Sequence, residues 1–211
     1  MNSFIVQVAT SKHSHFANEI CELIEASAKH RGTGIATRSP EYIRQKMAEG
    51  KAIIALLGNS TLVGFCYIES WSNRQYVANS GLVVTPDFRS AGVATKIKKK
   101  AFQHSQKLFP GAKLFGLTTS LPVMKINSEL GYVPVTYDKL TADNDFWSGC
   151  KSCVNYEILM SKNKVNCMCT AMLFDSKNNG KTRWNFMKKS KIYERFMRRK
   201  KSKLSKKSVK S

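Results

Sequence analysis

Residues 81–95 have the sequence GLVVTPDFRSAGVAT, in which an apolar stretch is followed by an Arg-x-x-Gly-x-Ala turn. The apolar part predicts a strand, and the residues from Gly92 onward predict the start of a helix. Small residues at positions 90–92 and 94 would let successive backbone N–H groups converge on an anion at this helix N-terminus, where the partial charge is positive. The stretch therefore predicts a cradle for a diphosphate.

The helix after this turn is expected over residues 92–108 and should be amphipathic. Val93, Ile97 and Ala101 recur on one side of it at helical spacing. Most of the lysines in the helix are expected on its solvated side, although any of them could meet an outer phosphate. These lysines are Lys96, Lys98, Lys99 and Lys100.

Periodicity in the rest of the chain predicts further strands and helices. Strands are expected at residues 4–9, 52–57, 62–69, 75–85 and 113–119, with extended chain at 132–135 and later strands at 156–160 and 170–174. Helices are expected at residues 15–29, 39–49, 92–108 and 122–130. This order predicts an α/β fold, a mixed central β-sheet flanked by helices, with one domain over residues 1–175.

The net charge of +21 is concentrated near the C-terminus, where 14 Lys and Arg residues and a single acidic residue, Glu194, follow residue 180. Residues 176–211 are therefore expected to form a basic, flexible tail. Such a tail could attract an anionic partner, such as nucleic acid, an anionic membrane or an acidic protein, in a salt-dependent way. A solvated tail without a specific partner is the alternative interpretation.

The chain has no apolar stretch of about 18 residues, so no membrane-spanning helix is expected. Residues 1–9 contain only a short apolar run and lack the charged leader and longer apolar core of a secretory signal. A cytoplasmic location is therefore expected.

The apolar strand, the Pro-Asp-Phe-Arg turn, the Arg-x-x-Gly-x-Ala motif and the basic helix together resemble the GNAT superfamily of acyl-CoA-dependent N-acyltransferases. The resemblance implies the GNAT fold and a site for coenzyme A. It also implies that the pantetheine arm pairs with the backbone of Leu82, Val83 and Val84. The residues implied to hold the diphosphate are Arg89, Ser90, Ala91, Gly92, Val93, Ala94 and Thr95.

Three further segments, at residues 34–39, 114–120 and 129–135, resemble the acyltransferase domain of N-acetylglutamate synthase. This resemblance implies acyl transfer from acetyl-CoA to the α-amino group of L-glutamate, the first step of arginine biosynthesis. The amino-acid kinase domain of many synthases has no counterpart in the sequence, so a short form is expected. Succinyl-CoA stays open as the donor, because neither the cradle nor the strand contacts the acyl end.

A dicarboxylate substrate needs fixed cations and hydroxyl or N–H donors, because a buried carboxylate is costly unless it is paired. Arg38 is the candidate carboxylate clamp, and a surface role near a helix start is its alternative. The other candidate substrate-binding residues are Ser39, Thr118, Thr119, Ser120 and Asn127.

Attack of an amine on a thioester needs a base for the ammonium, donors for the oxyanion and a proton for the leaving thiolate. Glu69, at the end of a predicted strand, is the candidate base, and the backbone N–H groups of Val83 and Val84 are the candidate oxyanion donors. Many GNAT enzymes place a tyrosine acid where this chain has Asn127. Water or Tyr137 is therefore the candidate acid, if the thiolate needs one.

The segment 150–169 is rich in cysteine and contains a Cys-x-x-Cys pair followed by a Cys-x-Cys pair. Four thiols are the number that a tetrahedral zinc ion binds, which makes a structural zinc site one hypothesis. Reduced, partly buried thiols are the other interpretation. The residues concerned are Cys150, Cys153, Cys167 and Cys169.

Two other functions fit the sequence. A GNAT enzyme could act on another amine, such as a protein lysine, a polyamine or an antibiotic, although cationic acceptors favour an acidic cleft. A nucleic-acid-binding or ribosome-associated protein could instead use the basic tail. A homodimer is compatible with the sequence, which does not fix the oligomeric state.

Overall fold

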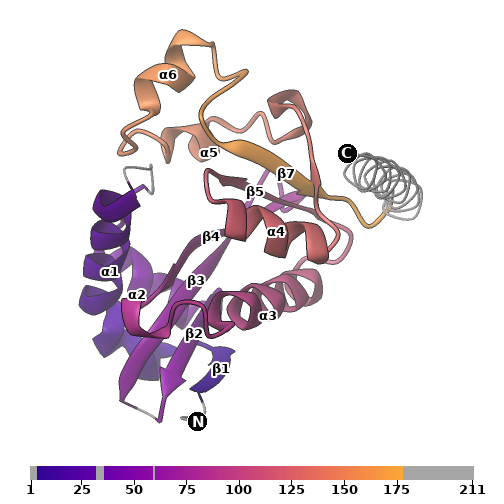
Figure 1. Ribbon diagram of the computed structural model, residues 1–211. Helices are drawn as coiled ribbons and strands as arrows, with labels where there is room; N and C mark the ends of the chain where they lie inside the picture. The colour runs from indigo at the N-terminus through magenta and orange to yellow at the C-terminus, as the bar shows by residue number, and fades with distance from the viewer. Residues whose placement is uncertain (1–3, 32–35, 59, 178–211) are drawn as a thin grey trace, which may run out of the picture. The chain divides into compact units, whose positions relative to one another are not determined.

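The described residues of the computed structural model, 4–31, 36–58 and 60–177, form a seven-stranded sheet with the order β1-β2-β3-β4-β5-β7-β6 (Figure 1). Every neighbouring pair is antiparallel except β4 and β5, which run parallel. The predicted mixed sheet is therefore confirmed. Its strands are β1 (Phe4–Val8), β2 (Ala52–Leu57), β3 (Thr61–Trp71), β4 (Tyr76–Val84), β5 (Lys113–Thr118), β6 (Val133–Pro134) and β7 (Thr170–Phe174).

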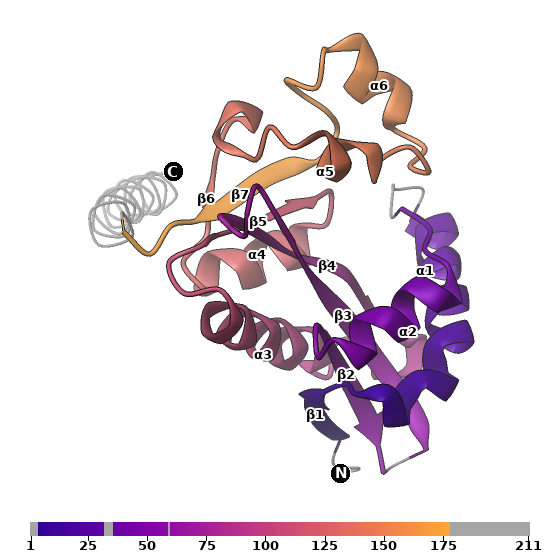
Figure 2. The ribbon, with the colours of Figure 1, turned by 180° about the vertical axis from the view of Figure 1, so that it is seen from behind.

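Helices cover both faces of this sheet, as Figures 1 and 2 show from opposite sides. The α-helices of the described residues are α1 (Ala17–Arg31), α2 (Pro40–Ala48), α3 (Val93–Leu108), α4 (Leu121–Glu129), α5 (Asn144–Ser148) and α6 (Tyr156–Ser161). Short 3₁₀ helices lie at Ser11–Phe16, Pro86–Phe88 and Tyr137–Lys139. These elements belong to a compact unit that ends at Asp175, and most of the predicted basic tail lies outside the described residues.

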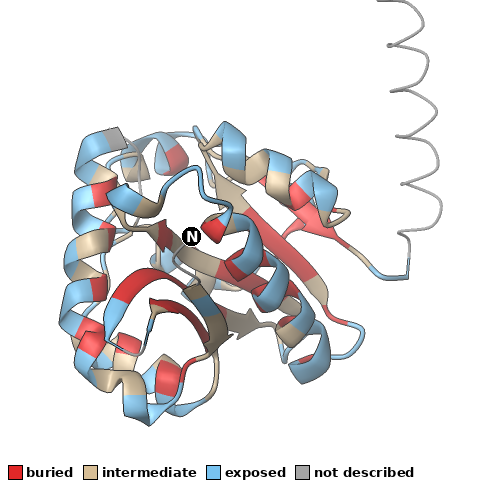
Figure 3. Cartoon of the chain, turned by 60° about the horizontal axis from the view of Figure 1, so that its bottom comes forward, coloured by how far each residue is buried: buried red, intermediate tan, exposed pale blue. Residues whose placement is uncertain are grey.

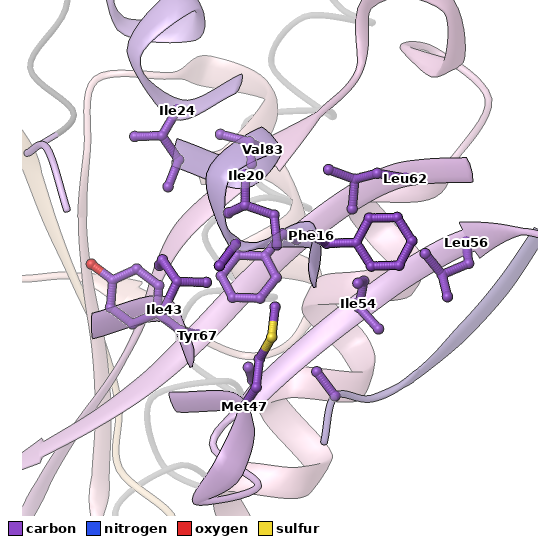
Figure 4. Close-up of a cluster of buried hydrophobic side chains, with 14 residues drawn as sticks. Phe16, Ile20, Ile24, Ile43, Met47, Ile54, Leu56, Leu62, Tyr67 and Val83 are labelled. Carbon is purple, nitrogen blue, oxygen red and sulfur yellow. The ribbon is translucent and has the colours of Figure 1, made fainter. Parts of the chain in front are cut away.

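Alternation along β2 divides the core into two layers. Ile54 and Leu56 point to the face covered by α1 and α2, where they join Ile20 (Figure 4). Ile53 and Ala55 point to the opposite face and pack in another cluster, whose other buried members lie on β3 and α3. Because successive side chains of a strand point to opposite faces, a fully apolar strand fits between two helical layers. In Figure 3 the strands are mostly buried, whereas the helices alternate between buried and exposed residues.

A β-bulge interrupts the pairing of β3 with β4. Tyr67 lies opposite Ser80 and Phe65 lies opposite Val83, so one residue of β3 faces two of β4 and β4 bends. Gly81 lies in the bulge with a φ of +62°, and a Cβ atom at this position would collide with the ring of Tyr67. Glycine is therefore required where β4 bends.

The strand predicted at residues 156–160 is wrong, because this segment forms α6. Tyr156 and Leu159 have the i, i+3 spacing of a helix face and pack against the same apolar cluster. Glu157 lies in the first turn, where a negative charge stabilises a helix. The short apolar run is thus amphipathic at the helical period and was too short to distinguish the two periods from the sequence.

In the part of the chain that the structure describes, none of the helices combines the length and the apolar character that crossing a membrane requires.

Candidate active site

An opening in the sheet lies between β4 and β5. The two strands pair over residues Tyr76–Ala78 and Lys113–Phe115, and β5 then continues its pairing with β7 as far as Thr118. Beyond Ala78, β4 pairs only with β3 in the described residues. The β5-facing edge of the rest of β4 is therefore left for a ligand or solvent.

A cavity of about 230 Å³, called the central cavity below, lies at this opening. Its walls combine the bulge region of β4, the end of β5 and side chains from both faces of the sheet. Among the residues that line it are Arg38, Tyr67, Glu69, Asn79, Gly81, Leu82, Lys98, Thr118, Thr119, Ser120, Asn127, Asp145 and Cys150. Most candidate substrate-binding residues are thus brought together, although they come from distant parts of the chain.

A larger cavity of about 610 Å³, called the α3–α4 groove, lies next to it and shares Leu82, Ser120 and Val123 with the central cavity. The predicted coenzyme A residues that line this groove are Leu82, Val83, Val84, Arg89, Ser90, Gly92, Val93, Ala94 and Thr95. The structure therefore places all of these predicted residues except Ala91 along one groove. Their binding role remains a prediction.

The turn before α3 has the geometry expected for an anion cradle. Ser90 and Gly92 both have positive φ values, 64° and 78°, and a Cβ atom at Gly92 would meet no other atom within 4 Å. Gly92 is the N-cap of α3, so the N–H groups of the first helical turn point toward this space. The open space and the helix N-terminus fit a diphosphate.

The two predicted oxyanion donors point in opposite directions. The Thr85 N–H donates to the Val63 carbonyl of β3, and N–H groups two residues apart on a strand point the same way. The Val83 N–H therefore points to β3, whereas the Val84 N–H points to the free edge of β4. Only Val84 of this pair, together with Leu82, presents its N–H group to the opening.

Glu69 lines the central cavity and accepts a hydrogen bond from the hydroxyl of Tyr42 on α2. Burial of Tyr42, reinforced by the nearby Glu69 carboxylate, raises the pKa of the phenol above its usual value. Tyr42 therefore stays protonated and holds one carboxylate oxygen of Glu69, which leaves the other for a substrate. Nothing in the sequence signalled this contribution of Tyr42.

Arg38 reaches the same cavity from the segment before α2. Its guanidinium carbon lies 5.5 Å from the ring centroid of Tyr42 and 5.8 Å from that of Tyr67. These cation–π contacts, and the hydrogen bond from Nη1 to the Thr37 carbonyl at 2.8 Å, hold the guanidinium without neutralising its charge. Arg38 can therefore offer its remaining N–H groups to an anionic substrate.

The remaining predicted substrate residues divide into two groups. Thr118, Thr119 and Ser120 line the central cavity at the end of β5, although the Thr118 hydroxyl already accepts from the Ser120 N–H at 3.1 Å. Ser39 does not line the cavity: it is the N-cap of α2, and its hydroxyl accepts from the Tyr42 N–H. Ser39 therefore positions Arg38 and Tyr42 through the helix start.

Asn127 occupies the wall of the central cavity and is only 1% exposed. Its Nδ2 atom lies 3.7 Å from the Met172 sulfur, and its Oδ1 atom has no hydrogen-bond partner in the described residues. The alternative acid, Tyr137, lines neither cavity. Its hydroxyl donates instead to the Cys169 carbonyl at 2.9 Å. Tyr137 is therefore not placed to reach a substrate in the central cavity.

Lys98 differs from the expectation of a solvated lysine. It is 2% exposed and lines the central cavity, with Nζ 3.2 Å from the Asn79 carbonyl. Ile97, Ala101 and Phe102 lie on the same buried face of α3, and position 98 has the i, i+4 spacing to Phe102 that a core residue would have. This spacing could have indicated a buried position in the sequence, but lysine is polar and was therefore expected to be solvated.

The segment around α5 closes the central cavity on the side of Arg38. Asp143 caps α5 and also accepts from the Ser72 N–H at 3.1 Å, which attaches this helix to the β3–β4 turn. The Ser152 hydroxyl accepts from the Thr37 N–H at 3.1 Å. Two separate hydrogen bonds therefore join this segment to the elements that carry the site.

The predicted zinc site is not supported. Burial and the neighbouring thiols raise the pKa of Cys150 to about 11 and that of Cys169 to about 12, which fits the alternative interpretation of reduced, partly buried thiols. The sulfurs of Cys153 and Cys167 are turned to the backbone of Asn155, at 3.4 Å from its nitrogen and 3.7 Å from its oxygen. Among the described residues, no group of three or more His, Cys, Asp or Glu is arranged to hold a metal ion.

Neither a family model nor a curated protein sequence matches this chain. Solved structures resemble it in fold, beginning with N-acetylglutamate synthase from Neisseria gonorrhoeae complexed with coenzyme A and N-acetyl-glutamate. That structure has a TM-score of 0.59 at 17% identity, over 83% of this chain and 35% of the other. This chain therefore spans about a third of the length of that synthase.

Two other solved structures match over nearly their whole length. Rv2747 from Mycobacterium tuberculosis, in complex with CoA, has a TM-score of 0.58 at 15% identity, over 81% of this chain and 98% of the other. The structure of yncA from Salmonella typhimurium with its cofactor acetyl-CoA has a TM-score of 0.54 at 11% identity, over 82% of this chain and 94% of the other. The chain therefore has the GNAT fold of N-acetyltransferases.

Proposed function

We propose that this protein transfers an acyl group from acyl-CoA to the α-amino group of L-glutamate, the first step of arginine biosynthesis. The observation that carries the proposal is the position of the central cavity. It lies where the predicted coenzyme A groove meets Arg38, whose guanidinium contacts the rings of Tyr42 and Tyr67. The Neisseria gonorrhoeae synthase with the same fold was solved with coenzyme A and N-acetyl-glutamate, which supports the same pair of ligands here.

Acyl-CoA would lie in the α3–α4 groove, with its diphosphate at the α3 N-terminus and its pantetheine arm along the free edge of β4. The N–H groups of Leu82 and Val84 would pair with this arm or with the developing oxyanion. Arg38 would bind a carboxylate of glutamate in the central cavity, beside the hydroxyls of Thr119 and Ser120. These contacts would bring the amine and the thioester carbonyl together at the bulge.

Glu69 would take a proton from the glutamate ammonium, because it lines the cavity and keeps one oxygen free of Tyr42. The neutral amine would then attack the thioester carbonyl, and the Val84 N–H would stabilise the oxyanion. An acetyl or a succinyl group would both be transferred by this chemistry. A succinyl donor would need a further cation near the acyl end.

A second candidate acceptor is a cationic amine, such as a polyamine or a protein lysine. The observation that favours it is the presence of two carboxylates, Glu69 and Asp145, among the residues that line the central cavity. Arg38, which lines the same wall, favours the anionic acceptor instead.

The test is a thiol-release assay with acetyl-CoA and succinyl-CoA against L-amino acids, polyamines and peptides. We expect release that depends on L-glutamate, with one acyl donor preferred. Release with a cationic amine alone would move the acceptor to the second candidate. No release with any acceptor would leave coenzyme A binding without catalysis and favour a role of the basic tail with an anionic partner.

A further inference from the structure

Lys98 extends a buried amino group to the wall of the central cavity. Its Nζ atom has three N–H donors, and one of them bonds to the carbonyl of Asn79, two residues before the bulge glycine. The Asn79 side chain is fixed in turn, because its amide donates to the Ser105 hydroxyl at 2.8 Å. The ammonium is therefore held at the point where β4 leaves β5, with N–H groups still available to the cavity.

The surroundings of Lys98 contain no opposite charge that pairs with it. Among the described residues, none of the ion pairs includes Lys98. The titratable groups beside it are the Cys66 thiol of β3 and the Tyr132 ring, whose centroid lies 5.7 Å from Nζ. Burial raises the pKa of Cys66 to about 11 and also raises that of Tyr132, so both neighbours are neutral near pH 7.

Burial lowers the pKa of Lys98 from its usual value, and the Cys66 thiol opposes this shift only in part. Other charged groups face the same space from elements nearby. Arg38, Glu69 and Asp145 line the central cavity, and Lys125 and Glu129 of α4 line the adjoining groove.

Lys98 lies on the side of the sheet from which the coenzyme A sulfur would approach. Helices α3 and α4 border the groove predicted for coenzyme A, and Lys98 and Asn127 extend from these two helices to the central cavity. The Asn127 amide does not give up a proton at neutral pH. The Tyr132 hydroxyl already donates its proton to Asn79 Oδ1, at 3.4 Å. Lys98 is thus the group on this wall with both an exchangeable proton and a pKa lowered toward that of a thiol.

We propose that Lys98 is the general acid that protonates the coenzyme A sulfur as it leaves, an inference that rests on the proposed acyl transfer. When the tetrahedral adduct collapses, the C–S bond breaks and its electron pair goes to sulfur. Lys98 gives an Nζ proton to this sulfur, and the amide product and neutral coenzyme A thiol are formed. Two protons leave the acceptor nitrogen through Glu69 to solvent, one from the ammonium before attack and one from the tetrahedral adduct as the amide forms. Lys98 takes one proton back from solvent, so the reaction releases one proton overall.

Burial reduces the difference in acidity between the donor, Lys98, and the acceptor, the coenzyme A sulfur. A free thiol has a pKa of about 8.5 and a solvated lysine one of about 10.4. Proton transfer is most efficient when the acid and the leaving group have similar pKa values, and a buried lysine is closer to a thiol than a solvated one. The lowered pKa also predicts that activity falls at alkaline pH, once Lys98 loses its proton.

The test compares Lys98→Met with Lys107→Met, an exposed lysine near the end of the same helix. We expect Lys98→Met to lower kcat roughly 100-fold or more, within the range for general acid catalysis, with little change in KM for either substrate. The alkaline fall in the pH profile of kcat should disappear with Lys98. Lys107→Met should keep both the rate and the profile.

A readout independent of turnover follows the thiol of bound coenzyme A by the ultraviolet absorbance of its thiolate. In the wild type, the ammonium beside the sulfur should lower the pH at which this thiol ionises, relative to Lys98→Met. Equal ionisation in the two proteins would overturn the proposal. Lys98→Arg separates the roles further, because arginine keeps the charge but cannot give up a proton near neutral pH.

Three other results would contradict the assignment. Full activity of Lys98→Met or Lys98→Arg would do so, and so would a wild-type kcat without an alkaline fall below pH 10.5. The wild-type profile decides the question even if both variants fail to fold. A wild type that acylates no acceptor would instead reject the proposed function, which keeps the two failures distinct.

Discussion

Arg38 acts at the scale of a single residue, because its charge is the feature of the central cavity that favours an anionic acceptor. Arg38→Ala removes a charged hydrogen-bond partner, and such bonds contribute about 1.5–3 kcal/mol. We therefore expect the KM for L-glutamate to rise by roughly 10-fold to 100-fold, since 1.4 kcal/mol corresponds to tenfold. Steady-state kinetics with each substrate varied in turn measures this.

The matched control is Arg44→Ala, an arginine of α2 that bonds to Glu41 and Asn18 at the surface. It should leave both KM values unchanged. An Arg38→Ala protein with normal glutamate kinetics would remove the carboxylate clamp from the proposal. A parallel rise in the KM for acetyl-CoA would indicate damage to the whole site instead.

Residues of the candidate site differed in how far the sequence revealed them. The groove residues from Arg89 to Thr95, apart from Ala91, could be predicted because a local turn and helix start place them. The roles of Tyr42, which bonds to Glu69, and of Asp145, which lines the central cavity, could not be predicted, because both depend on tertiary packing of distant elements. Lys98 has the spacing of a core residue in the sequence of α3. Because lysine is polar, a solvated side chain was predicted, and this prediction was wrong.

The bulge of β4 acts at the scale of an element, because it bends the strand away from β5 and opens the sheet. Gly81→Ala would force a Cβ atom against Tyr67 and a non-glycine residue to a positive φ. We expect the free energy of unfolding to fall by about 2–6 kcal/mol, from roughly 1–3 kcal/mol each for backbone strain and for overpacking. Coenzyme A affinity should fall as well, because the edge of β4 shifts.

Gly111→Ala separates the two causes. Gly111 also has a positive φ, 77°, but a Cβ atom there would meet nothing within 4 Å. Denaturant unfolding should show a smaller loss for Gly111→Ala than for Gly81→Ala, with coenzyme A affinity kept. Equal losses in stability and in affinity would mean that the contact with Tyr67 is unimportant.

Elements were predicted well where the period of the apolar residues was supported by a local signal. Helix α2 follows a Ser-Pro start, and the Ser39 hydroxyl does accept from the Tyr42 N–H. Helix α6 has no such signal: Asn155, at its N-cap, makes no side-chain capping bond. Packing against the cluster that contains Trp147 decides its conformation, and a short run cannot reveal this contact.

Buried phenols set the alkaline limit of the whole molecule. Burial raises the pKa of Tyr42, Tyr67, Tyr132 and Tyr137 above the usual value of 10.0. These groups hold their protons more tightly in the folded state, so their contribution to stability is complete below pH 10 and is lost as the pH rises further. We expect cooperative unfolding in alkali.

Parallel titrations by tyrosinate absorbance and circular dichroism would measure this transition. The two signals should change together for the buried phenols. Complete ionisation of all tyrosines at about pH 10 in a protein that keeps its circular dichroism would contradict the expectation. Lys98 has the opposite effect on the pH dependence of stability. Because its pKa is lowered in the folded state, the free energy of unfolding rises as the pH rises through that pKa toward 10.5. Lys98→Met should remove this gain.

The short parallel pairing between β4 and β5 has a consequence for the order in which the chain folds. Strands β2 to β4 are antiparallel neighbours joined by short turns, whereas joining β4 to β5 requires the long crossover through α3. Contacts between distant segments form late because their loop entropy must first be overcome. The amides around Ala78 and Phe115 should therefore exchange with deuterium before those at the centre of β3, so the active-site opening is also where the native sheet first separates.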